Sequence, residues 1–328
     1  MPDLLLQETN PYGTRRASLL RGWGDAYLYL EDLVADAPST RAAVWVANHA
    51  PTPRPHEDVE PGAPPRMGAG GTLHPDGCPH PTALRLVWFE EGDGVALLDD
   101  DGVLAAIPGW GGEGEFAGYA RHARGRTALA WELNGETLGL LEAKVAQSEA
   151  HWAWRSGAWA EIRDRGFAHL EARLGPAEEV WPLDGGRFPE VVASRHRVGT
   201  RDLWVTATTG LSAQRMAGVE ANVADPDSAA CIELAVASSA PDASGAELLA
   251  RLATIPFGRC TWLGEGHTVA RRDPVPGVGG EILTADPPEG ADGPAPDLSG
   301  LSQRELPVTY LWALVIDEPA VEVAQRAG

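Results

Sequence analysis

The chain of 328 residues is long enough for two domains, and with 44% hydrophobic and 22% charged residues it has the composition of a globular protein. Collagen, coiled coils and a largely disordered chain are therefore excluded. The net charge of −21 leaves no basic stripe, which argues against nucleic acid and anionic membranes as partners, because clustered Lys and Arg bind phosphate groups. A basic protein partner is compatible with this charge.

The cysteines and the apolar stretches of the sequence indicate in which cellular compartment the protein is expected. Cys78, Cys231 and Cys260 are far apart and odd in number, which is typical of a reducing compartment and not of a disulfide framework. Residues 1–10 lack the basic and apolar regions of a signal peptide, and no apolar stretch is long enough for a membrane span. We therefore expect a cytoplasmic, soluble protein; the sequence does not define its oligomeric state.

The first part of the chain, residues 1–147, is predicted to be a mainly β lobe. Six prolines between residues 51 and 71 predict a long surface loop, because proline cannot donate a ladder hydrogen bond. Glycine and aspartate turns separate the apolar runs that follow it, as in a β-meander. The strands expected in this lobe are 27–30, 43–46, 84–89, 95–98, 103–107 and 127–133.

Residues 148–328 contain the signals of both helices and strands. Apolar residues repeat with the period of a helix over 159–174, and Gly175-Pro176 is a typical helix stop. A capping-box pattern from Ser244 to Glu247 predicts a second helix to about residue 253, closed by Pro256. Strands are expected at 190–198, 202–208, 230–236, 281–285 and 308–316, an exposed loop within 274–296, and a helix after Pro319.

A metal site is the first candidate for chemistry. His49, His56, His74, Cys78 and His80 are ligand types that zinc uses, but no standard spacing fixes a fourth ligand, so a plain loop is favoured. A metal-dependent hydrolase built on these residues remains the alternative function. Elemental analysis would end that hypothesis if it found less than about a tenth of an equivalent of metal.

The other catalytic motifs are incomplete. Asp99, Asp100 and Asp101 lack the spacing of a calcium loop, and no glycine-rich loop matches a dinucleotide or phosphate fingerprint. The Gly210-Leu211-Ser212 turn lacks the closing glycine of a nucleophile elbow, because residue 214 is Gln. We therefore expect no catalytic residue, metal or cofactor, and no enzyme. A structural scaffold without a ligand is a third possibility.

Five short motifs in the second half of the chain occur in the same order as in the sequences of a known family. The block from Leu203 to Ser212, followed by Met216, resembles the strand and turn at the core of suppressor of fused (SUFU) domains, bacterial branch. The further matches are Ile232-Glu233-Leu234, the helix around 248–252, residues 264–268 and the strand 308–316. One departure is Ile316-Asp317, where many relatives have a Pro-Ile pair. The lobe 1–147, with its Trp110, looks like the extension of larger bacterial members.

The resemblance implies an α+β domain with a mixed sheet, helices packed on one side, and a binding module in place of an enzyme. Animal members bind transcription factors of the Hedgehog pathway by clamping a peptide, and bacterial members are regarded as immunity proteins against secreted toxins.

We therefore expect a cytoplasmic protein-binding module that neutralises a toxin by direct binding. The acidic surface would attract a basic partner, and exposed Trp side chains would anchor it, although core packing is the simpler role of any single Trp. The expected contact segment is Thr208, Thr209, Gly210, Leu211 and Ser212, which otherwise forms only a turn.

Overall fold

The chain forms two compact units, Met1–Trp154 and Arg155–Gly328. The structure is a computed structural model that describes residues 2–22, 24–52, 64–185, 188–200, 202–275, 278–290, 293–317 and 319–321. The boundary predicted between residues 147 and 148 falls inside the helix α1 (Gly135–Arg155). Each unit is described below by itself.

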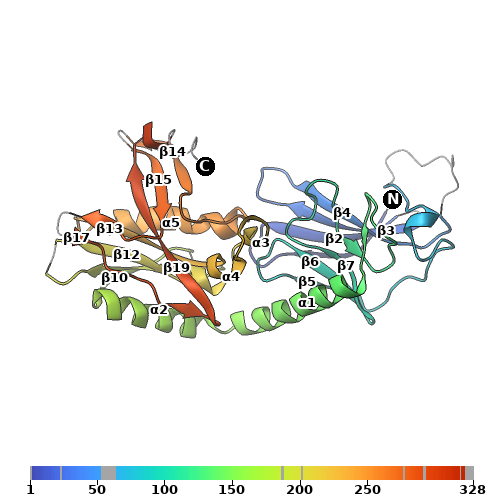
Figure 1. The fold of residues 1–328 in the computed structure, drawn as a ribbon, viewed down its shortest axis with the longest axis horizontal. Helices are drawn as coiled ribbons and strands as arrows, with labels where there is room; N and C mark the ends of the chain where they lie inside the picture. The colour runs from blue at the N-terminus through green and yellow to red at the C-terminus, as the bar shows by residue number, and fades with distance from the viewer. Residues whose placement is uncertain are drawn as a thin grey trace. The chain divides into compact units, whose positions relative to one another are not determined.

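Two sheets build the N-terminal unit, and their strand pairs are antiparallel except for one parallel pair (Figure 1). One is the sheet β1 (Asp3–Thr9), β2 (Arg15–Arg21), β3 (Asp25–Asp32) and β4 (Ser39–Asn48), in that order. The other begins with the meander β5 (Arg85–Trp88), β6 (Val95–Asp99) and β7 (Gly102–Ile107), which confirms the three strands predicted there. Leu28, Trp45, Leu97 and Leu104 are fully buried in one core to which both sheets contribute.

The strand predicted at 127–133 is wrong. The hydroxyl and amide of Thr127 both bond the carbonyl of Ala130, at 2.9 and 3.1 Å, and these bonds close a turn. Only β9 (Trp131–Glu132) is extended, and it pairs in parallel with β8 (Tyr119–Ala120). In the proline-rich stretch, residues 53–63 lie outside the described part, and the described remainder contains the short 3-10 helix η1 (Ala69–Gly71).

The helix α1 has no counterpart among the elements predicted from the sequence. Its first turn is capped by Asn134, whose side-chain oxygen accepts from the Thr137 amide at 3.1 Å. Leu141 and Val145 are four residues apart, and they pack on the outer face of the meander in a second small core. Lys144 extends this contact with an ion pair of 2.6 Å to Glu91. The apolar stripe is short and interrupted by Ala, Glu and Gln, so its helical period is weak.

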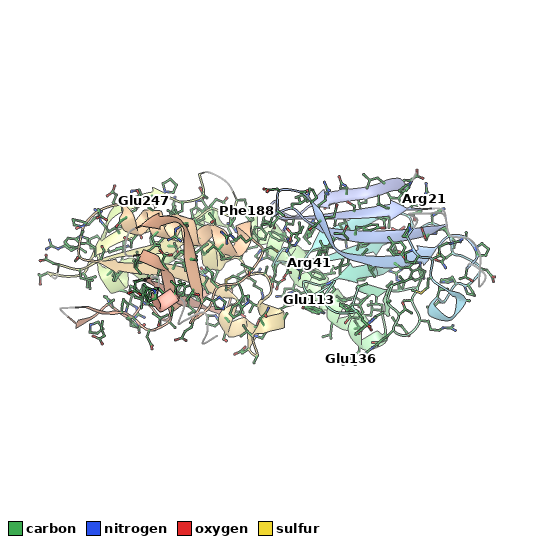
Figure 2. All side chains as sticks on the ribbon, turned by 90° about the horizontal axis from the view of Figure 1, so that it is seen from above. Arg21, Arg41, Glu113, Glu136, Phe188 and Glu247 are labelled. Carbon is green, nitrogen blue, oxygen red and sulfur yellow. The ribbon has the colours of Figure 1, made fainter. Side chains whose placement is uncertain are left out.

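Charged side chains cover the outside of the units. Figure 2 shows Arg41 and Glu113 on the N-terminal unit, where their side chains form an ion pair of 3.3 Å. Glu113 is 63% exposed and Arg41 is 32% exposed, so solvent weakens the attraction and the pair contributes little to stability.

The C-terminal unit is built around one mixed sheet. Its strand order is β10-β11-β12-β13-β19-β15-β14, with β18 also paired to β19; only β13 and β19 run parallel. The strands are β10 (Ala177–Pro182), β11 (Val192–Arg197), β12 (Trp204–Thr209), β13 (Cys231–Ser238), β14 (Thr268–Val275), β15 (Val278–Thr284), β18 (Ser302–Gln303) and β19 (Leu306–Ile316), and a hairpin joins β16 (Glu289–Gly290) to β17 (Gly293–Pro294). The predicted α+β class with a mainly β N-terminal region is confirmed.

The helices of this unit are α2 (Trp159–Leu174), α3 (Val219–Asn222), α4 (Pro226–Ala229) and α5 (Ser244–Gly258), with the short 3-10 helix η2 (Leu211–Ala213) after β12. The helix predicted at 159–174 is confirmed as α2. The second helix starts as expected, but its N-cap is Ala243 without a side-chain cap, and Pro256 lies inside its last turn instead of closing it. Residues 319–321 are helical, and the rest of the expected terminal helix lies outside the described residues.

The helices lie on both faces of this sheet, not on one as predicted. Gly166 of α2 packs against Thr209, whereas Gly245 of α5 packs against Thr206. These two threonines are three positions apart on β12, so their side chains point to opposite faces. One helix therefore covers each face of β12, and the interior of this part of the sheet is closed from both sides.

In the described part of the chain, no helix combines the length and the apolar character that crossing a bilayer requires.

Candidate functional site

The expected contact segment, residues 208–212, lies in the interior. Thr208, Thr209, Leu211 and Ser212 are between 0% and 4% exposed. Their strand β12 pairs with β11 on one side and with β13 on the other. The strand that leads into this segment is therefore not at an edge of the sheet, and the side chains of Thr208, Thr209, Leu211 and Ser212 are buried in this structure. A role in binding stays a prediction.

The carboxylate of Glu233 organises this segment from the neighbouring strand. Its Oε2 accepts from the Thr208 hydroxyl at 2.6 Å. Its Oε1 accepts from the Gly210 amide at 2.9 Å and from the amide and hydroxyl of Ser212 at 3.1 and 2.7 Å. Thr208 in turn accepts from the Leu234 amide at 2.8 Å. Side chains thus take over the hydrogen bonding where the β12–β13 ladder ends.

Burial opposes the negative charge of this carboxylate. Glu233 is 1% exposed, and its desolvation raises its pKa, while the hydrogen bonds from Thr208, Ser212 and Gly210 act in the opposite direction. The pKa of the buried Tyr310 phenol is raised by its own burial and by the charge of Glu233. The two groups face each other under α2, where the ring of His169 stacks on Tyr310 at 5.9 Å. This arrangement holds the turn in place.

Gln214 and Arg155 extend the same network. The Gln214 amide donates to the Gly210 carbonyl at 3.2 Å, and its oxygen accepts from Arg155 at 2.5 Å. The Arg155 guanidinium also pairs with Glu190 at 2.6 Å and lies over the ring of Phe188. Glutamine at position 214, which broke the nucleophile motif in the sequence, therefore has a structural role here.

The C-terminal unit has an open groove on the same sheet. Its volume is about 370 Å³, and it is lined by residues 236–239 of β13 and its end, residues 313–315 of β19, and the β16–β17 hairpin. We call it the fork groove. Val315 is 52% exposed there, an unusual exposure for a valine on a sheet. Asp202 and Glu289 also line the groove, and no Lys or Arg does so among the described residues. No pattern in the sequence predicts this groove.

The N-terminal unit has a second open pocket, of about 470 Å³, lined by His74, Cys78, His80, His122 and the acidic turn 99–101. We call it the histidine pocket. The rings of His74 and His122 meet edge to face at 4.7 Å, and the ring of His80 lies 4.0 Å from that of His49. Three of the five predicted metal ligands, His74, Cys78 and His80, therefore do line one pocket, which His122 joins from a distant position in the sequence.

The histidine pocket is not arranged as a metal centre. No group of three or more His, Cys, Asp or Glu side chains in the described ranges is placed to hold a metal ion. The Cys78 thiol donates to the Asn48 carbonyl at 3.3 Å, and burial raises the pKa of this thiol. His56, the remaining predicted ligand, lies outside the described residues.

The pKa of His122 predicts how the stability of the N-terminal unit depends on pH. Burial, with smaller contributions from His74 and Arg121, lowers the pKa of His122 from 6.5 to about 4. The unfolded chain therefore binds this proton more readily, and the N-terminal unit should lose stability as the pH falls from about 6.5 toward 4. His122→Gln should flatten that slope in thermal melts recorded across this range.

His80→Gln is the matched control. His80 is exposed in the same pocket, and its removal leaves the imidazole of His122 in place. An unchanged slope in His122→Gln would contradict the burial of a neutral His122.

Most Trp side chains of the described residues are buried or half-buried. Trp45 and Trp312 are fully buried, and Trp110 is the one Trp among the large exposed apolar side chains of the described residues, at 36%. Core packing is therefore the role of Trp45 and Trp312.

Comparisons with known proteins address the C-terminal part of the chain. The family model of the suppressor of fused protein (SUFU) matches residues 181–328. A crystal structure of a SUFU homolog from Neisseria gonorrhoeae FA 1090 is 14% identical, with a TM-score of 0.36 over 51% of this chain and 83% of that one. No curated protein matches the chain. Residues 181–328, which the suppressor of fused family model matches, hold β11 to β19, the Glu233 network and the fork groove.

Proposed function

We propose that the chain is a non-enzymatic protein-binding module whose C-terminal unit captures a partner protein, and that it acts in a bacterium as an immunity protein that neutralises a toxin by direct binding. The observation that carries the proposal is the fork groove, an open groove with an exposed apolar side chain inside the region that matches the suppressor of fused family. The partner would be a basic protein domain in the cytoplasm.

The electrostatics of the chain support a basic partner. The net charge of −21 produces a negative potential around the protein, which speeds the approach of a positively charged domain. The fork groove also carries negative charge, because Asp202 and Glu289 line it. Apolar contact at Val315 would then supply the part of the affinity that does not depend on salt.

Co-expression with the product of the neighbouring gene tests the proposal. We expect the tagged chain to retain that product at low salt and to relieve its toxicity in the cell. The affinity should fall on the order of tenfold between about 50 and 500 mM salt, because screening weakens attraction between surface charges.

An unrelated protein of equal basic charge is the control, because general attraction to an acidic surface would retain it equally well. The proposal fails if no protein is retained at low salt. It also fails if the chain turns over a substrate in a reaction that one polar substitution abolishes.

A further inference from the structure

We infer that two copies of this chain associate through β1, in an antiparallel pairing of β1 with itself that is centred on Leu5 and joins the two four-stranded sheets into one. The inference concerns the N-terminal unit. It is independent of the proposed capture of a partner by the C-terminal unit.

β1 is the end strand of its sheet, and its outer edge is open. Among the described residues, strand pairing joins β1 to β2 alone. The opposite end of the same sheet is covered, because the amide of Trp45 on β4 donates to the carbonyl of Leu129 at 3.0 Å. An open edge carries unpaired N–H and C=O groups, and these are a template for pairing with another strand.

Leucines make this open edge apolar. Leu4 and Leu5 are 54% and 37% exposed, and no other two neighbours in the described sequence are both large, apolar and exposed. Natural edge strands are usually protected by proline or by charged side chains. The edge strand β10 has two glutamates and a proline, whereas residues 4–7 of β1 include no charged residue and no proline. The edge of β1 therefore lacks the usual protection against pairing.

The charges around β1 favour a second copy over a basic partner. The chain carries a net charge of −21, so two copies repel each other in general. β1 and β2 are an exception, because three arginines and two carboxylates give these two strands a net charge of +1. One of the arginines, Arg21 (Figure 2), forms an ion pair of 2.7 Å with Asp3. This edge therefore repels a second copy only weakly and does not attract a basic domain.

The sequence of β1 matches itself in the antiparallel direction. In a pairing centred on Leu5, the pairs between the two copies are Leu5–Leu5, Leu4–Leu6 and Asp3–Gln7. No carboxylate then faces another carboxylate, and leucine faces leucine. The register of β1 on β2 skips Leu5, so self-pairing gives this side chain the cross-strand neighbour that β2 does not supply. A twofold contact of this kind is the commonest arrangement of identical chains.

Sedimentation velocity of the full chain over a concentration series measures the association. We expect a reversible dimer with a Kd of about 100 µM or tighter in about 0.5 M NaCl. The Kd should be about tenfold or more weaker in about 50 mM NaCl, because repulsion between two acidic chains is screened less there. A basic partner bound through its charge would show the opposite dependence on salt.

Leu5→Lys should raise the dimer Kd about tenfold or more, because the two lysines would face each other at the axis. Leu73→Lys is the matched control. Leu73 is an exposed leucine of the same unit, 47% exposed, and it lies outside the strands of this sheet. Its substitution changes the net charge equally, and we expect the Kd to change less than about twofold. Both side chains are exposed, so circular dichroism should show an unchanged fold.

A cysteine cross-link tests the register. Residues directly opposite each other in antiparallel strands have Cα atoms about 4.5–5.5 Å apart, which a disulfide can span. Leu5→Cys should therefore form a disulfide-linked dimer with oxidised glutathione. Thr9→Cys should not, because eight residue steps place the two Thr9 positions about 27 Å apart. The unmodified chain, with its three free cysteines, gives the background.

Four outcomes would overturn the inference: a monomer at every concentration in high salt, a dimer that Leu5→Lys leaves intact, a dimer that weakens as salt rises, or a cross-link at Thr9 in place of Leu5. Loss of the neighbouring gene product from Leu5→Lys would also overturn it, because this edge would then belong to the partner. The proposed function fails separately, if the unmodified chain retains no partner whether or not it forms a dimer.

Discussion

Glu233→Ala is expected to lower the free energy of unfolding of the C-terminal unit by about 3–5 kcal/mol. Glu233 accepts four hydrogen bonds from three residues of the 208–212 segment, all buried. Alanine would leave the hydroxyls of Thr208 and Ser212 and the amides of Gly210 and Ser212 without this acceptor. A buried donor that loses its acceptor costs its full desolvation, so the four losses together exceed the effect of an ordinary surface substitution.

Urea denaturation of the full chain, followed by circular dichroism, measures this effect. Glu265→Ala is the matched control, because Glu265 is an exposed glutamate of the same unit and its removal should change stability by less than about 0.5 kcal/mol. Equal stability of the two variants would show that the Glu233 carboxylate does not hold the turn.

The ionisation of Glu233 gives this prediction a pH dependence. Burial raises its pKa above the ordinary value of 4.5, so the folded protein holds the proton more tightly than the unfolded chain does. Its contribution to stability is thus fully present below pH 4.5 and is lost as the pH rises through the folded pKa. Glu233→Gln, which cannot ionise, should lack this slope, and its stability relative to the unmodified chain should improve as the pH rises from 4 to 8.

Gly210→Ala is expected to cost about 3–5 kcal/mol. Gly210 has φ = 119°, which side-chain-bearing residues rarely adopt. A Cβ atom there would overlap the carbonyl oxygen of Glu190 and would lie 3.0 Å from the ring of Trp159. Neither the backbone of Glu190 nor the helix that begins at Trp159 can move away without breaking other contacts, so strain and overlap add.

Gly199→Ala separates these two causes. Gly199 also has positive φ, 59°, but a Cβ atom there would meet nothing within 4 Å. Its substitution should therefore show the backbone cost alone, about 1–2 kcal/mol. The difference between the two variants in thermal denaturation measures the overlap at Gly210. If both variants lose the same stability, the close approach of Glu190 is not part of the folded protein in solution.

Local patterns in the sequence were sufficient for the elements whose signal lies in neighbouring residues. The meander of β5, β6 and β7 follows from apolar runs separated by glycine and aspartate, and α2 follows from a regular apolar stripe with Gly175 and Pro176 at its end. The resemblance to suppressor of fused domains followed from the order of five short motifs, and it implied the α+β class. Where the local signal was weak, as in α1 with its few large apolar residues, the helix forms because Leu141 and Val145 find a sheet to cover.

The candidate site required contacts between residues far apart in the chain. The small and polar residues of the 208–212 segment predict an exposed turn. In the structure the segment is buried, because Glu233, more than 20 residues away, accepts hydrogen bonds from its polar groups. The faces of β12 are closed because Gly166 and Gly245 admit a helix on each side, which no pattern within one element encodes. The fork groove exists because β19 leaves β13 after Trp312 to follow β15. The sequence by itself determined the strands and helices whose signal lies in neighbouring side chains, such as the β5–β7 meander and α2. Only the tertiary structure decided which polar groups are buried and which strand edges stay open, since those depend on packing between distant segments.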